Sequence, residues 1–223
     1  MNVSEAIEGR QSIRAFDSDR EVTGEVINSI LTTAGRAPSG SNIQPWHVYV
    51  VTGAAKNRIT DACTARYLSG DEGESEYHYY PQTWRQPYIG RRRQTGFGLY
   101  GLLGIDKANT EAVQGYRVTN YQFFGAPMGL FFTIDRDMEL GSWVDYGMFL
   151  QSIMLSARDA GLETCAQAAF CPYYQSVMPL LNAPDEQMLV CGMSLGYPQR
   201  EAVINGYRTE RLDAQSFTTF LQD

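Results

Sequence analysis

Residues 10–14 read Arg-Gln-Ser-Ile-Arg, and residues 37–46 read Ala-Pro-Ser-Gly-Ser-Asn-Ile-Gln-Pro-Trp. In extended backbone, alternate side chains point to the same side. Arg10, Ser12 and Arg14 are therefore expected to face one spot, with Gln11 and Ile13 turned away. Two guanidiniums and a hydroxyl facing one spot favour a phosphate dianion, because arginine forks pair with its oxygens. The alternative is a solvated basic edge.

The second stretch has the composition of a fixed turn. We expect Gln44 to be extended because Pro45 follows it, and Trp46 to pack beneath the turn. Such a loop presents N–H, hydroxyl and amide groups to a polar heterocycle. The alternative is an ordinary structural turn between a helix and a strand.

Outside these stretches, hydrophobic patterns predict the main elements. Asn2 and Glu5 have capping-box spacing, and Thr23 is placed to cap a second helix that ends at Gly35. Strands are expected at 47–51, 129–134 and 187–196. A long helix from about Ser142 to Ala160 is apolar on most faces, so it should be nearly surrounded by protein. One α+β domain is the simplest account.

Residues 66–125 differ in composition, with dense aromatics, glycines and the run Arg91-Arg92-Arg93. We interpret them as one or two helices plus loops, an excursion that forms either a lid with an aromatic wall or a small subcore. Residues 96–101 match Gly-x-Gly-x-x-Gly, but no strand precedes them and no acidic residue follows at the expected distance. Close packing of small residues explains them better than dinucleotide binding.

The bulk composition narrows the function. The net charge is −7 with a pI of about 4.9, which argues against nucleic-acid binding. No apolar run approaches the ~18 residues of a membrane span. The four cysteines lack metal or disulfide spacing, and the two histidines make a metal site or a Ser-His-Asp triad improbable. We therefore expect a cytoplasmic protein with reduced thiols, no metal and no membrane.

Taken together, residues 10–16, 37–46, 161–169 and 205–212 resemble the motifs of the nitroreductase family. The resemblance implies a nitroreductase-like α+β fold, with a central, mostly antiparallel sheet flanked by helices and a long buried helix at a dimer interface. It implies a single domain over 1–223 with a lid at about 66–125. It also implies FMN at the interface of a homodimer, with the loop 37–46 contacting the flavin of the partner subunit.

The residues that the resemblance assigns to the cofactor are Arg10, Ser12, Arg14, Pro38, Ser39, Gly40, Asn42, Gln44, Gln167, Ala168, Ala169, Arg208 and Arg211. Ala168 and Ala169 stand where the family often has an acidic residue and a glycine, so contacts there rest on backbone N–H groups. Tyr80, Trp84 and Tyr88 are assigned to a small aromatic substrate. No residue is assigned a catalytic role, because flavin N5 transfers the hydride.

The predicted activity is an FMN-dependent oxidoreductase that uses NADPH or NADH to reduce nitroaromatic compounds to hydroxylamines, with ping-pong kinetics, as in the breakdown of xenobiotics. The alternatives are a related reductase of quinones, enones or halogenated aromatics, a flavin-binding module without turnover, or an anion-binding structural protein.

Overall fold

A four-stranded sheet organises the computed structural model, which describes residues 1–222. The strands are β1 (His47–Thr52), β2 (Met128–Asp135), β3 (Glu163–Gln167) and β4 (Gln187–Gly196), in the order β1-β2-β4-β3, and all neighbours run antiparallel. The expected strands at 47–51, 129–134 and 187–196 and the antiparallel sheet are thereby confirmed. The short strand β3 lies in the segment 161–169, for which no strand was predicted.

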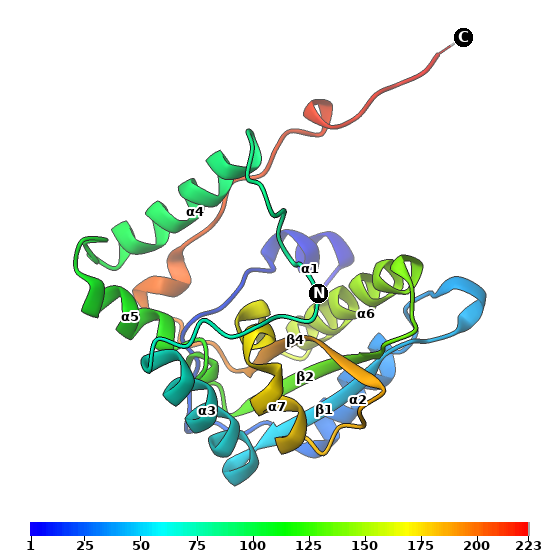
Figure 1. Ribbon diagram of the computed structural model, residues 1–223. Helices are drawn as coiled ribbons and strands as arrows, with labels where there is room; N and C mark the ends of the chain where they lie inside the picture. Colours follow the sequence, from blue (N-terminus) through cyan, green and yellow to red (C-terminus); the bar gives the residue numbers. More distant parts are fainter. Residues whose placement is uncertain (223) are drawn as a thin grey trace.

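Helices cover both faces of this sheet (Figure 1). On one face, α2 (Gly24–Ala34) and α6 (Leu140–Asp159) pack on Leu130, Phe132 and Ile134. On the other face, α3 (Gly53–Leu68) and α7 (Tyr174–Leu180) pack around Phe131. Because β2 alternates between these two cores, every residue from Met128 to Ile134 is buried, as the mostly apolar sequence predicts.

The expected helix caps are present. Asn2 and Glu5 form a reciprocal capping box on α1 (Val3–Gly9), and the Thr23 hydroxyl accepts from the Val26 N–H at the start of α2. Each cap satisfies N–H groups that the first helical turn leaves without partners. These local signals set where α1 and α2 begin, and therefore where the segment 10–16 between them runs.

The long helix was predicted within two residues of its observed bounds, but its surroundings differ from the prediction. Tyr146, Phe149 and Ile153 are buried against the sheet, whereas Leu140 and Val144 are 81% and 67% exposed. Within this chain the helix is therefore not surrounded by protein. One of its faces remains apolar and open.

The excursion contains α4 (Tyr88–Leu102) and α5 (Thr110–Val118), and α4 stands apart from the sheet beside the chain's C-terminal segment (Figure 1). The Gly-x-Gly-x-x-Gly run lies inside α4. A Cβ placed on Gly98 would lie 2.4 Å from the Tyr207 hydroxyl oxygen. This close approach confirms that at least this glycine of the run serves packing.

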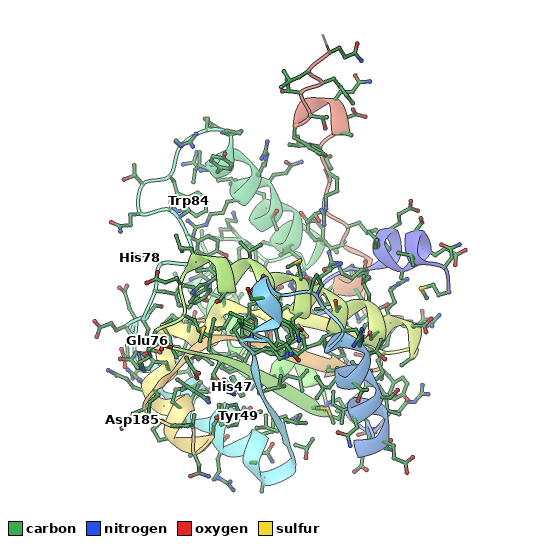
Figure 2. The ribbon with its side chains drawn as sticks, turned by 90° about the vertical axis from the view of Figure 1, so that its right-hand side faces the viewer. His47, Tyr49, Glu76, His78, Trp84 and Asp185 are labelled. Carbon is green, nitrogen blue, oxygen red and sulfur yellow. The ribbon has the colours of Figure 1, made fainter. Side chains whose placement is uncertain are left out.

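A strap of residues 71–77 ties the excursion to the core. Tyr77 donates to the Val190 carbonyl, and the Glu74 N–H donates to the Pro172 carbonyl at 2.9 Å. Glu76 pairs with Arg136 at 2.6 Å and accepts from the Leu189 N–H. Figure 2 shows Glu76, His78 and Trp84 in succession, leading from the level of the sheet toward the excursion.

Candidate cofactor site

The segment 10–14 is fastened to the edge of the sheet. Ser12 forms a parallel bridge with Thr164 of β3, and the Ile13 N–H donates to the Thr164 carbonyl at 3.1 Å. Ile13 is 2% exposed and acts as the apolar anchor of the segment. This pairing holds the backbone between Arg10 and Arg14 extended, as predicted.

The arginines of this segment meet two from the other end of the chain. Arg10, Ser12 and Arg14 line a cavity of about 530 Å³ together with Arg208 and Arg211. Gln11 also borders this cavity. Its side-chain amide is turned to the C-terminal segment, where Nε2 donates to the Asn205 carbonyl at 2.8 Å and Oε1 is buried without a partner among the described residues.

Charge is concentrated in this cavity. Burial, and next the charge of Arg211, lower the pKa of Arg10. Burial raises the pKa of Glu163, although Arg158 and Arg10 oppose that shift. Guanidiniums that repel one another in a half-buried cavity are the arrangement that an anion relieves. Four guanidiniums line this cavity against one carboxylate, that of Glu8, so an anion site stays the prediction here.

A second, larger cavity lies along the outer edge of the sheet. Ala166, Gln167 and Ala168 line it with side chains such as Trp143 and Tyr77, and its volume is about 790 Å³. Gln151 lines both this cavity and the arginine cavity. The two spaces are therefore neighbours, with one polar side chain between them.

The residues at the end of β3 present backbone rather than side chains. The Gln167 side chain is 3% exposed; its Nε2 donates to the Asn120 carbonyl and its Oε1 accepts from the Ser194 hydroxyl. Ala169 packs against the core that contains Phe170. Cys165 is 3% exposed, so its thiol is buried and packed.

The loop 37–44 lies elsewhere. Its residues line neither of these cavities in the described chain, 1–222. Ser41, Asn42 and Gln44 have φ of 50°, 59° and 50°, so the expectation of an extended Gln44 is wrong. The Ser39 hydroxyl accepts from the Gln44 N–H at 3.0 Å, and this contact accompanies the left-handed turn despite Pro45. Such backbone strain is typical of functional loops.

Other loop contacts explain where 37–46 is held. The Gly40 N–H donates to Asp145 Oδ2 of α6 at 3.0 Å. Trp46 stacks on Phe149 with ring centroids 4.5 Å apart, so it packs on the core rather than beneath an open turn. Ser41, Asn42 and Gln44 remain exposed. Pro38 is also exposed, while Ser39 is half-buried.

The three residues predicted to contact the substrate lie together. Tyr80, Trp84 and Tyr88 line one cavity of about 620 Å³ on α4 and the loop before it. This cavity shares no lining residue with the cavity at β3. In the described chain it is a separate aromatic site.

Sequence reasoning missed Gln11, Gln151 and Asn205 as lining or positioning residues. Asn205 lies 8% exposed between the two arginine-bearing segments and contacts residues about 190 positions away. No local pattern marks such a contact, although an asparagine directly before glycine near two arginines was visible. No three His, Cys, Asp or Glu side chains gather as metal ligands in residues 1–222, and no helix there is both long and apolar enough to cross a bilayer.

With this fold and these cavities, the chain belongs to the nitroreductase family, whose model matches residues 7–197. Among curated proteins it is 40% identical to a 4-nitrobenzoate reductase from Nocardioides sp. (strain LMS-CY), over 97% of this chain and 89% of that protein. It is 38% identical to a nitrobenzene nitroreductase from Ectopseudomonas oleovorans, over 99% of this chain and 97% of that protein.

Similar solved structures also belong to nitroreductases. The FMN- and NADPH-dependent nitroreductase NfnB from Sphigopyxis sp. strain HMH superposes with a TM-score of 0.96 at 36% identity, over 100% of both chains. The FMN-dependent nitroreductase NfnB from Mycobacterium smegmatis, solved in complex with NADPH, superposes with a TM-score of 0.92 at 32% identity, over 98% and 97%. The predicted family and fold are confirmed.

Proposed function

We propose that this chain is an FMN-dependent oxidoreductase that uses NADPH or NADH to reduce nitroaromatic compounds to hydroxylamines. The observation that carries the proposal is the arginine cavity joined through Gln151 to a wide cavity at the edge of the sheet. The names of the similar proteins support the same conclusion, since they are nitroarene reductases or FMN-dependent nitroreductases.

The residues present fit FMN. Its phosphate matches the guanidiniums of Arg10, Arg14, Arg208 and Arg211 and the hydroxyl of Ser12. The cavity beside Ala168 has room for a flat ring system.

When bound, the flavin supplies hydride acceptance and delivery at N5. The chain's own residues hold and orient the flavin. The arginines anchor the phosphate end, and the backbone at 166–169 borders the ring end of the site. Trp143 and Tyr77 exclude water from the apolar side of the cavity. Because donor and acceptor take turns at one face, ping-pong kinetics follow and no protein nucleophile is required.

We further propose that a second copy of the chain completes the site. The open face of α6 carries Leu140, Val144 and Met148, which are 81%, 67% and 36% exposed. The polar loop 37–44 lies beside this face, since Gly40 is bonded to Asp145. A homodimer through α6 buries these apolar groups and places Pro38, Ser39, Gly40, Asn42 and Gln44 at the partner's flavin. The four buried free thiols support a location in the reducing cytoplasm.

A bleaching assay tests the proposal. Purified protein is expected to be yellow, to lose flavin absorbance on addition of NADPH or NADH, and to recover it with a nitroarene such as nitrobenzoate. Bound flavin that neither nicotinamide bleaches would rule out the enzyme and leave a flavin-binding module. A colourless protein that does not take up added FMN would rule out the cofactor.

The phosphate site is tested by substitution. Arg14→Ala and Arg211→Ala are expected to release FMN while leaving the weaker binding of riboflavin unchanged, because riboflavin lacks the phosphate. Arg58→Ala, at an exposed position of α3, is the charge-matched control. Full retention of FMN in both site variants would show that the phosphate lies elsewhere.

A further inference from the structure

Gln167 borders the proposed flavin cavity, yet both ends of its side-chain amide are bonded inside the protein. The residue is 3% exposed and lines that cavity between Ala166 and Ala168. Its Nε2 donates to the Asn120 carbonyl at 2.6 Å, and its Oε1 accepts from the Ser194 hydroxyl at 2.7 Å. The side chain therefore connects other parts of the fold, and the backbone is left to face the cofactor.

The Asn120 carbonyl belongs to the turn that leads from α5 of the excursion back to β2 of the sheet. In this turn Phe123 and Phe124 have φ of 53° and 54°, a left-handed conformation that bulky residues rarely adopt. The same carbonyl also accepts from the Phe123 N–H at 3.1 Å. Gln167 thus bonds to the start of a strained turn, and such strain persists only where the surrounding structure holds it in place.

A pair of buried rings makes a second link between the turn and the flavin side of the sheet. Phe170 comes directly after Ala168 and Ala169, and its ring centroid lies 4.9 Å from that of Phe123. Glycines make room for both rings. A Cβ on Gly129 would lie 2.4 Å from the Phe123 ring, and one on Gly192 would lie 2.7 Å from the Phe170 ring. Because rings packed this closely have no space to slide, a shift of the turn shifts the segment beside the flavin.

We propose that Gln167 is a positioning residue for hydride transfer, which holds the backbone at 166–168 in place by tying it to the turn after α5. The inference rests on the proposed function, in which this backbone borders the ring end of the flavin. Hydride transfer needs donor and acceptor atoms in close, aligned contact, and a misplacement of about 1 Å can cost on the order of 100-fold in rate. The position of α5 and the placement of the flavin ring are thereby set together.

Gln167→Met tests the link, because it keeps the length of the side chain and removes both hydrogen bonds. In stopped-flow bleaching of the holoenzyme, the limiting rate constant of flavin reduction is expected to fall about tenfold. The Kd of the nicotinamide and the Kd of FMN should change less than about twofold, because the arginine cavity is untouched. A readout without turnover is hydrogen exchange, which should become faster at 119–125 and at 166–170 together, with and without FMN.

Gln187→Met is the matched control. Gln187 is 7% exposed, and its Oε1 accepts from the hydroxyls of Tyr49 and Thr133, but it lines none of the cavities described above in residues 1–222. It should lower stability and leave the rate of flavin reduction and the exchange of both segments unchanged.

Ser194→Ala removes only the hydroxyl bound to Oε1 and should show the effects of Gln167→Met to a smaller degree, which keeps the test available if Gln167→Met does not fold. An unchanged rate in Gln167→Met, an equal loss in Gln187→Met, or exchange that quickens at 166–170 alone would overturn the inference. A wild-type flavin that neither nicotinamide bleaches would instead refute the proposed function, and the exchange measurement would still decide whether the two segments are linked.

Discussion

The side-chain oxygen of Asn205 accepts a hydrogen bond from the backbone N–H of Arg14 at 2.8 Å. The same amide donates to the carbonyls of Ala15 and Gln199 at 2.8 and 2.9 Å. One nearly buried side chain thus joins the two ends of the chain that supply the arginines. The convergence of these arginines on one cavity depends on this residue, although Asn205 itself lines neither cavity.

We expect Asn205→Ala to lower the free energy of unfolding by about 2 kcal/mol, since it leaves buried groups of residues 14, 15 and 199 without partners. The Kd for FMN should rise about tenfold or more as Arg14 loses its position. Urea denaturation and FMN titration measure the two effects.

Asn57→Ala, at an exposed position of α3, is the control and should change neither quantity. Riboflavin distinguishes a positioning effect from general loosening, because its affinity should change less than that of FMN. Equal weakening of riboflavin and FMN would contradict a specific effect on the phosphate end.

A second prediction concerns the contact between α4 and the C-terminal segment. Gly98→Ala should lower stability by about 1–3 kcal/mol or displace α4, because the new Cβ meets the ring of Tyr207. Gly101→Ala has no atom within 4 Å and should instead stabilise α4 by up to about 1 kcal/mol. Thermal unfolding and the rate of proteolysis within residues 88–102 compare the two. Similar behaviour of both variants would refute this contact.

Local patterns predicted much of the fold. The strand at 187–196 was predicted with its observed bounds, because a long apolar run closed by Tyr197 and Pro198 has one simple structure. The helix caps at Asn2 and Thr23 were also predictable, because each depends on residues only three positions apart. The strand β3 was missed since Glu163–Gln167 is short, and its identity as a strand depends on pairing with residues 192–196.

The candidate site was predictable only in part. The alternation of Arg10, Ser12 and Arg14 follows from extended backbone, and the structure holds it so. The orientation of the Gln11 side chain does not follow from the local sequence, because it depends on the Asn205 carbonyl, 194 positions away. The prediction of an extended Gln44 failed for a related reason. The rule for residues before proline is only a tendency, and here the hydrogen bond from the Gln44 N–H to the Ser39 hydroxyl accompanies a left-handed backbone.

The buried thiols lead to a prediction about pH. Burial raises the pKa of Cys63 to about 12 and that of Cys171 to about 11, from the ordinary thiol value of about 9. A raised folded-state pKa gives stability that is complete below the unfolded pKa and is lost as pH rises toward the folded value. Stability should therefore fall above about pH 9, by about 1.4 kcal/mol per pH unit for each such thiol.

Urea denaturation between about pH 8 and pH 9.5 measures the onset of that fall, in a window below the ordinary tyrosine pKa of about 10. Cys171→Ala is expected to make the slope shallower. A thiol reagent at pH 8 should modify no cysteine in the native protein and all four after unfolding. Rapid labelling of the native protein would show that these cysteines are more accessible than the structure places them.

The last prediction concerns the hold of α6 on the loop 37–44. Asp145 is 8% exposed, and its carboxylate accepts from the Gly40 N–H where the loop enters its left-handed turn. Asp145→Ala removes this attachment while leaving Leu140, Val144 and Met148 in place on the face proposed to join two copies. Size-exclusion chromatography should therefore still show a dimer, whereas the Kd for FMN should rise about tenfold because the partner's loop is no longer held at the flavin.

Asp137→Ala, at an exposed aspartate in the turn before α6, is the control and should leave both the dimer and the Kd for FMN unchanged. An unchanged Kd in a dimeric Asp145→Ala protein would mean that the loop is a structural turn and takes no part in holding the cofactor.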